Sequence, residues 1–94
     1  MASQHARYRA DVDGHRVEIE FDRRRVVLNE VRVFVDGEQV DRGSVFYGDK
    51  ELRAPVGSSE LTVVVTSGMV GELLRAQVRR DDGAWVDLRD TTAA

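Results

Sequence analysis

Apolar and polar residues alternate along most of the chain, and an Asp-Gly pair interrupts the alternation at three places. Apolar residues stand at every second position on both sides of the first pair, Asp13-Gly14. Asp-Gly supplies the two residues with positive φ that a type I′ turn needs. A two-residue loop there places Val12 opposite His15. Ala10 then faces Val17, so the apolar side chains share one face of an antiparallel hairpin.

The second pair, Asp36-Gly37, lies between two further valine-rich segments. The same kind of loop places Val35 opposite Glu38. Two residues further from the turn, Val33 is expected opposite Val40. The pattern therefore predicts a second hairpin whose valine side chains lie on one side.

The third turn, Asp81-Asp82-Gly83, requires a longer loop. With two loop residues, Val78 would face Asp87, and the strand would mix apolar and polar side chains on one face. With three loop residues, and Gly83 in the left-handed position of a bulge, Val78 faces Val86 instead. The phase of the apolar residues therefore predicts the three-residue loop.

Further short strands are predicted between turns that contain glycine, at residues 44–47, 51–56, 60–66 and 69–80. The first two of these are expected to be divided by a turn at Gly48-Asp49-Lys50. Pro55 cannot donate a backbone hydrogen bond, so its strand is expected at the edge of a sheet or to end there. Residues 23–30 are compatible with a broad connection or with a strand that kinks at Asn29.

Residues 70–78 could also form a helix, because the spacing of their apolar residues is close to that of one face of a helix. Gly71 weakens a helix at this place. The hairpin that follows favours a strand, in which Leu74, Ala76 and Val78 share one face.

Seven or more short strands, with turn signals every 8–12 residues, predict an all-β fold. We expect an antiparallel two-sheet β-sandwich built from consecutive hairpins, with a small barrel as the alternative. A chain of 94 residues fits one domain. We place that domain at residues 6–90, between a flexible N-terminus at 1–5 and a flexible tail at 91–94.

Composition excludes several classes of site. The chain has no cysteine, which removes disulfides, thiolate metal ligands and cysteine nucleophiles. Its formal net charge is −3 and Lys50 is its one lysine, so no strongly basic nucleic-acid face is implied. No apolar run resembles a signal peptide or a membrane span, and a cytoplasmic, soluble protein without membrane association is expected. The bias toward Arg, Val, Asp, Gly and Ala is typical of a high-GC bacterial genome.

Few residues suggest catalysis or metal binding. The two histidines, His5 and His15, have no third ligand at metal-binding spacing, and no serine stands in a nucleophile elbow. Glu18 and Glu20 alternate on one strand, which sets their carboxylates about 7 Å apart, superficially like a glycosidase pair. In the first hairpin, however, these residues face Arg9 and Arg7, and a solvated outer face with cross-strand ion pairs is the preferred interpretation. We predict no enzyme activity, no cofactor and no metal.

The candidate contact residues are two aromatic residues and one basic run. Phe34 and Trp85 point away from the valines and leucines beside them, and Trp85 is expected opposite Arg79. Outward aromatic side chains are typical of a protein-contact surface or a homodimer face, although they could also fill a small second core. Arg23, Arg24 and Arg25 could hold an acidic partner. No aromatic residue interleaves that run, as a single-stranded nucleic-acid platform would require.

Four segments, in order, resemble the Fas apoptotic inhibitory molecule family: HRVEIEF (His15–Phe21), VRVFVDGEQV (31–40), VFYGDKELRAPVG (Val45–Gly57) and ELTVVVTSG (Glu60–Gly68). A late hairpin extends the resemblance over roughly residues 15–90. The sequence that follows Asp22 departs from the Ser/Thr-Gly-Lys/Arg stretch usual in that family. The resemblance implies a sandwich of two antiparallel sheets and no catalytic residues. The family binds other proteins in animal cells, and that role is not transferred to this chain.

The expected function is therefore that of a non-catalytic interaction or regulatory domain. It would bind an unknown protein partner, or a second copy of itself, through a sheet face or an edge strand. The alternative is a barrel that binds a small apolar ligand between its sheets, which needs a cavity above about 300 Å³.

Overall fold

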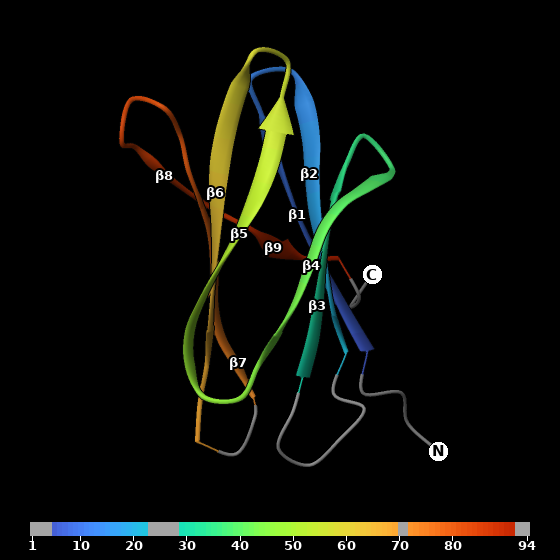
Figure 1. Cartoon of the computed structure of the whole chain (residues 1–94), viewed down its shortest axis with the longest axis vertical. Coiled ribbons are helices and arrows are strands. Elements are labelled where there is room, and N and C mark those ends of the chain that lie inside the picture. The colour runs from blue at the N-terminus through green and yellow to red at the C-terminus, as the bar shows by residue number, and fades with distance from the viewer. Residues whose placement is uncertain (1–4, 23–28, 70–71, 92–94) are drawn as a thin grey trace.

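The computed structural model describes residues 5–22, 29–69 and 72–91, in which the secondary structure consists of strands and turns (Figure 1). The sequence left the conformation of residues 23–30 open. Asn29 begins a strand, and residues 23–28 lie outside the described residues. The described part of the chain contains no apolar helix of membrane-spanning length. The strands are β1 (His5–Val12), β2 (His15–Asp22), β3 (Asn29–Val35), β4 (Glu38–Val45), β5 (Gly48–Val56), β6 (Ser59–Ser67), β7 (Leu73–Arg79), β8 (Trp85–Asp87) and β9 (Arg89–Asp90).

The strands form two antiparallel sheets, as the sequence predicts. Sheet 1 has the order β4-β3-β2-β1-β9, and sheet 2 has the order β5-β6-β7-β8. The two sheets remain separate, so the small-barrel alternative is not realised. The chain passes between the sheets twice: through Phe46 and Tyr47 after β4, and through Leu88 between β8 and β9.

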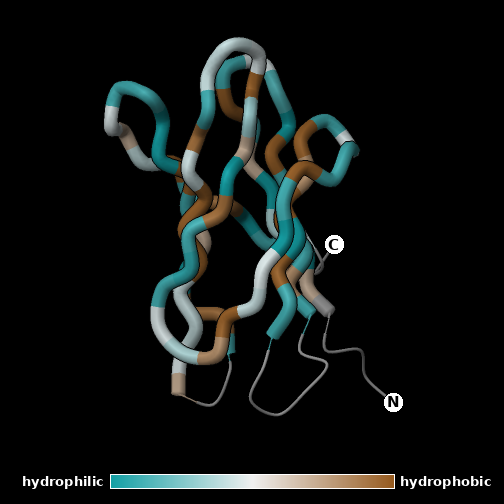
Figure 2. The backbone as a smooth tube through the Cα atoms, in the orientation of Figure 1, coloured by the Kyte–Doolittle hydropathy of each residue, from teal (hydrophilic) through white to brown (hydrophobic). Residues whose placement is uncertain are grey.

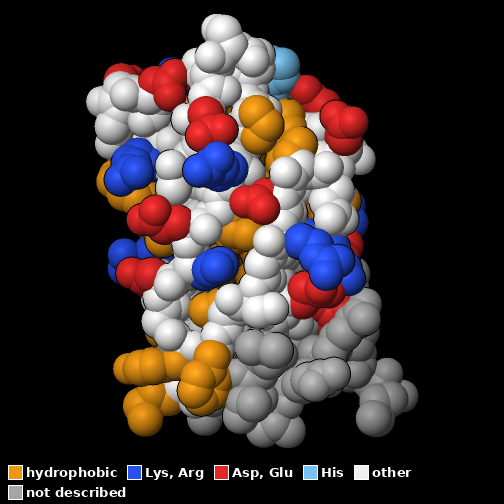
Figure 3. All heavy atoms as spheres, viewed as in Figure 1, with side chains coloured by type: hydrophobic (Ala, Val, Ile, Leu, Met, Phe, Trp, Pro, Cys, Tyr) orange, Lys and Arg blue, Asp and Glu red, His pale blue; other side chains and the backbone are white. Residues whose placement is uncertain are grey.

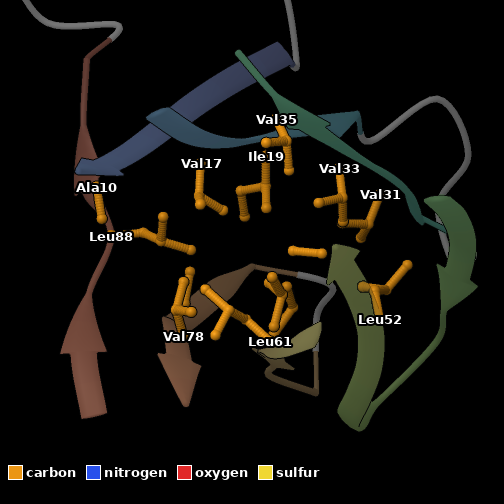
Figure 4. Close-up of a cluster of buried hydrophobic side chains, with 14 of the residues drawn as sticks. Ala10, Val17, Ile19, Val31, Val33, Val35, Leu52, Leu61, Val78 and Leu88 are labelled. Carbon is orange, nitrogen blue, oxygen red and sulfur yellow. The ribbon is translucent and has the colours of Figure 1, made fainter. Parts of the chain in front are cut away.

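The core lies between the sheets and is built mainly from valine. Figure 4 shows Val17, Ile19, Val31 and Val33 of sheet 1 pointing toward Leu61 and Val78 of sheet 2. These side chains are almost completely removed from solvent. Along β3 and β6, buried residues alternate with more exposed ones, and Figure 2 shows the corresponding alternation of apolar and polar positions. This is the period-2 pattern that a half-buried strand produces.

The two short hairpins have the predicted turn. Asp13 and Asp36 both have φ of 51°, and the glycines that follow them have φ of 81° and 87°, which defines type I′ turns. Val12 pairs with His15, and Val35 pairs with Glu38. The predicted registers are therefore confirmed next to both turns.

One register prediction is wrong. Val33 faces Asp41 rather than Val40, because a β-bulge at Val40 shifts the pairing of β3 with β4 after Phe34 and Gln39. Val40 still packs against the core. The shift allows the Asp41 carboxylate to accept hydrogen bonds from the backbone N–H groups of Arg42, at 2.8 Å, and Arg53, at 2.9 Å.

The connection between β4 and β5 also differs from the prediction. Residues 48–50 do not form a turn but begin β5, in which Gly48 pairs with Ser67. The turn lies at Phe46 and Tyr47, directly after the buried Val45. Gly48 has φ of 93°, a conformation that glycine adopts readily, and so the chain enters β5 immediately after this corner.

Residues 73–79 form a strand, as preferred over the helix, and the three-residue loop at 81–83 is confirmed. Val78 pairs with Val86, and Gly83 has φ of 87°. Leu74, however, does not share the inner face with Ala76 and is 63% exposed. A second bulge explains this: Thr66 pairs with Arg75 and Ser67 with Leu73, so Leu74 is the extra residue.

A polar contact fastens the first two hairpin turns to each other. The carboxylate of Asp36 lies 2.7 Å from His15 Nδ1 and accepts a hydrogen bond from the Arg16 N–H at 2.9 Å. The Asp36 N–H donates to the Arg16 carbonyl at 2.8 Å. The backbone hydrogen bond from Arg16, and then the contact with His15, hold the pKa of Asp36 below its usual range.

We predict that Asp36→Asn lowers the melting temperature more at pH 6 than at pH 2.5. A carboxyl group with a lowered folded-state pKa stabilises the protein above its unfolded pKa, and this contribution is lost as the pH falls through the folded-state pKa. Asparagine retains an acceptor and tolerates positive φ, so the turn is preserved. Thermal unfolding followed by circular dichroism measures the difference. Glu38→Gln in the same hairpin is the control and should shift the melting temperature little; equal losses at both pH values would contradict the prediction.

Candidate functional site

The outer face of sheet 1 carries a network of charges around Glu20. The predicted register is confirmed, with Arg7 opposite Glu20 and Arg9 opposite Glu18. Glu20 accepts hydrogen bonds from Arg7 at 2.7 Å and from Arg32 at 2.5 Å. Arg32 also binds Glu30 at 2.5 Å.

The expectation of a solvated face is wrong for the two glutamates. Glu18 and Glu20 are each only 8% exposed, because the arginines on the neighbouring strands lie over them. Arg9 does not bind Glu18 but lies 3.6 Å from Asp11, while Glu18 has Arg7 at 3.8 Å. A carboxylate held by two guanidinium groups is stabilised as an anion, which favours a structural role over acid–base chemistry.

The two predicted aromatic contact residues do not come together. Phe34 is half-buried on the outer face of sheet 1, and the guanidinium carbon of Arg7 lies 5.3 Å from its ring centroid. Trp85 lies in sheet 2, opposite Arg79 as predicted, with the guanidinium carbon 5.7 Å from its ring centroid. The indole is 49% exposed and is the more accessible of the two rings. Arg23, Arg24 and Arg25 lie outside the described residues.

The side of the sandwich formed by β4 and β5 is closed to added strands. β5 is an edge strand, as the position of Pro55 predicts, and Pro55 has no N–H to offer. The N–H of Arg53 on the same strand is taken by the Asp41 carboxylate. The Lys50 side chain lies over Gly43, where an added Cβ would be 2.8 Å from Lys50 Cε. Proline and charged side chains are the devices that protect sheet edges from further pairing.

The opposite side is open at β8. The Arg80 N–H donates to Ala84 O at 2.8 Å, and the Leu88 N–H donates to Ala76 O at 3.0 Å. Because backbone groups alternate along an antiparallel strand, Trp85 and Asp87 direct their N–H and C=O groups away from β7. β8 is the last strand of sheet 2 on this side, as Figure 1 shows. Its free edge therefore presents backbone donors and acceptors at Trp85 and Asp87.

A groove of about 650 Å³ runs beside this edge, between β8 and β1. Ala10 and Val86 contribute its apolar lining. Its other lining residues are Arg9, Asp11, Trp85, Asp87, Arg89 and Thr91. The free edge, the exposed indole and this groove form one continuous surface, which we call the β8 site.

A second cleft, of about 370 Å³, shares Asp87 with the groove. Tyr8, Leu73, Ala76 and Leu88 supply most of its apolar lining. Burial, and then the nearby Asp90 carboxylate, raise the pKa of Tyr8, so its hydroxyl remains a donor at neutral pH. Tyr8 comes from sheet 1 and Leu73 from sheet 2, so the cleft opens at the side of the sandwich.

One exposed apolar group was not anticipated. Phe46 and Tyr47 form the corner between β4 and β5, and Met69, which is 83% exposed, follows β6. Figure 3 shows apolar side chains gathered at the corresponding end of the molecule. The sequence placed Phe46 and Tyr47 in a strand, and the missed signal is Gly48, whose positive φ moves the turn to the preceding residues.

Within the described ranges, no three His, Asp or Glu residues are arranged to hold a metal ion. No family model, curated protein or solved structure matches the chain. The resemblance to the Fas apoptotic inhibitory molecule family therefore stays a prediction.

We predict that Glu20→Gln destabilises the fold by about 1–3 kcal/mol, because Arg7 and Arg32 lose a charged acceptor while remaining partly buried. Denaturant unfolding measures the loss. Glu51→Gln, at an exposed position of β5, is the matched control and should change stability by less than about 0.5 kcal/mol. If the two variants were equally stable, the network around Glu20 would have no structural role.

Proposed function

We propose that this protein is a non-catalytic interaction domain that binds an extended segment of another protein as an added strand on β8. The observation that carries the proposal is the free edge of β8, where Trp85 and Asp87 direct their backbone groups outward beside an open groove. An added strand obtains its affinity from main-chain hydrogen bonds and its specificity from the side chains on alternate positions.

The contrast between the two sides of the sandwich supports this choice of surface. Pro55 and the hydrogen bond from Arg53 to Asp41 obstruct the β5 edge. The outward-facing residues of β8, Trp85 and Asp87, are not prolines, so both have backbone N–H groups. The side chain of Asp87 does not cover this edge, because it accepts a hydrogen bond from Gln77 of β7 at 2.8 Å. Of these two edges, the one that is left open also has an exposed tryptophan beside it.

The side chains at the β8 site fit an extended partner. On a strand added to β8, side chains alternate between the outer face, beside Trp85, and the inner side, beside Val86 and Ala10. Trp85 offers a large flat surface that the Arg79 guanidinium already orients. Tryptophan is enriched among the residues that dominate protein interfaces.

The carboxylates on the outer face of sheet 1 give less support to an enzymatic function than the β8 site gives to an interaction domain. The closest pair of carboxylates suggested by the sequence, Glu18 and Glu20, is covered by arginines. A general acid or base must reach a substrate proton, and Glu20 is already held by two charged donors.

We predict that peptides selected from a random display library against the purified chain protect the amide protons of Trp85 and Asp87 from hydrogen exchange. Trp85 is the only tryptophan, so its fluorescence reports the same event. Asp87→Pro removes an outward N–H and the side-chain hydrogen bond from Gln77 but leaves the backbone hydrogen bonds to β7, and should weaken binding roughly tenfold. Asp87→Asn is the matched control and should bind within about threefold of the original chain.

Thermal unfolding of Asp87→Pro must show that the variant folds before its affinity is compared. Equal affinity of the proline and asparagine variants would overturn the proposal. Protection that maps to β5 instead of β8 would also overturn it.

The second cleft favours one further candidate, a site for a small apolar ligand. Its volume of about 370 Å³ exceeds the roughly 300 Å³ typical of the smallest ligand pockets, and the Tyr8 hydroxyl offers one directed donor. We expect 1-naphthol to shift the methyl NMR signals of Leu73 and Leu88 in a saturable way. Tyr8→Phe should weaken this binding several-fold through the lost hydrogen bond. Shifts that do not saturate, or that spread to an exposed methyl group outside the cleft such as that of Met69, would rule the candidate out.

A further inference from the structure

Two arginines of like charge face each other at the rim of the β8 site. Arg9 of β1 and Arg89 of β9 are directly paired, and both are exposed. Directly opposed residues of an antiparallel pair have their side chains on the same face, and like charges in this position are destabilising. Such a pair is relieved by an anion that binds both guanidinium groups.

The same sheet contains a second pair of opposed arginines, and the comparison is informative. Arg32 faces Arg42, but Arg32 is neutralised by Glu20 and Glu30, each at 2.5 Å. Among the carboxylates of the described residues, Arg9 has one ion-pair partner, Asp11, at 3.6 Å. Arg89 has no ion pair with any carboxylate of the described chain. Arg32 thus has two close carboxylates, whereas the Arg9–Arg89 pair has a single, more distant one, on the Arg9 side.

The Arg9–Arg89 pair lies where a bound strand would pass. Arg9 and Arg89 line the same groove as Trp85, Val86 and Asp87. The two aspartates of the groove are less available to a cation, because Asp11 lies near Arg9 and Asp87 accepts from Gln77. Arg89, in contrast, has no carboxylate partner among the described residues, so its guanidinium is the charged group of the groove that is left to bind a partner's carboxylate.

We propose that the segment recognised by the β8 site is acidic, and that an Asp or Glu side chain of the partner binds Arg9 and Arg89 together. This inference rests on the proposed function, because strand addition at β8 brings the partner to these arginines. Guanidinium groups bind carboxylates through two parallel hydrogen bonds, which gives the contact geometric selectivity as well as charge. The partner segment thus combines a carboxylate with an apolar side chain that contacts Val86 and Ala10.

The test uses acetylated and amidated peptides from the selection described above, in which the acidic residue is replaced by its amide. We expect the acidic peptide to bind the original chain roughly tenfold more tightly than its Gln or Asn counterpart at low salt, a difference that decreases as salt is added. Arg89→Gln should abolish this preference. Arg42→Gln, an exposed arginine of the β4 edge, is the matched control and should preserve it.

The outcomes separate the two proposals. If acidic and amide peptides bind equally but both protect the amides of Trp85 and Asp87, strand addition stands and the acidic preference is wrong. If acidic peptides bind through Arg89 without protecting these amides, the carboxylate site stands and strand addition fails. A phosphoserine peptide that binds more tightly than the carboxylate peptide would overturn the assignment to Asp or Glu.

Discussion

The structure depends on burying one valine-rich face of each sheet against the other. Two packed sheets lie about 10 Å apart, and medium-sized side chains such as Val31, Val33, Val63 and Val65 fill that space from both sides. Valine suits this position because its branched Cβ restricts its rotamers and packs well on a pleated surface. A register shift by one residue would turn an entire strand inside out, so the turns must fix the register. The Asp-Gly pairs meet this requirement next to the turns, with positive φ at both residues.

The chain crosses from one sheet to the other at both sides of the sandwich, and the two crossings differ in structure. Between β4 and β5, the chain turns tightly at Phe46 and Tyr47, and the bulge at Val40 places Asp41 to bind the neighbouring edge. On the other side, Leu88 alone carries the chain from sheet 2 to sheet 1. Its buried side chain fills the space between the sheets at that point. β8 has three residues and β9 has two, so neither strand covers the length of its neighbour. The groove and the second cleft result from this short crossing.

The hairpins, the two-sheet class and the edge position of Pro55 could be predicted because each depends on residues close in sequence. The misplaced features depend on contacts between distant segments. The bulge at Val40 is accompanied by the hydrogen bond from Arg53 to Asp41, which joins the two sheets. No local sequence pattern near Asp41 predicts this bulge. Leu74 has the right spacing for the core, yet the pairing with β6 shifts at Ser67 and turns it outward. Glu20 is polar and alternates correctly, but its burial follows from Arg32, which lies on the next strand of the sheet, β3. The orientation of Trp85 was predictable from hairpin phase, whereas the openness of its edge required the whole topology.

The arginine-rich composition explains why the two outer faces differ. A guanidinium group can lie flat over a ring or a carboxylate and bind it with several donors, which a lysine ammonium cannot do. On sheet 1, Arg7 contacts Phe34 and Glu20 at once, so an aromatic ring and a carboxylate that would otherwise be exposed are both covered. On sheet 2, Arg79 lies near Trp85 but leaves about half of the indole accessible. Covering an outer face with arginines requires carboxylates on adjacent strands, and sheet 1 provides them at β2 and β3. At the β1–β9 edge, Asp11 lies near Arg9, and Arg89 has no ion pair within the described residues, which is the basis of the acidic partner proposed above.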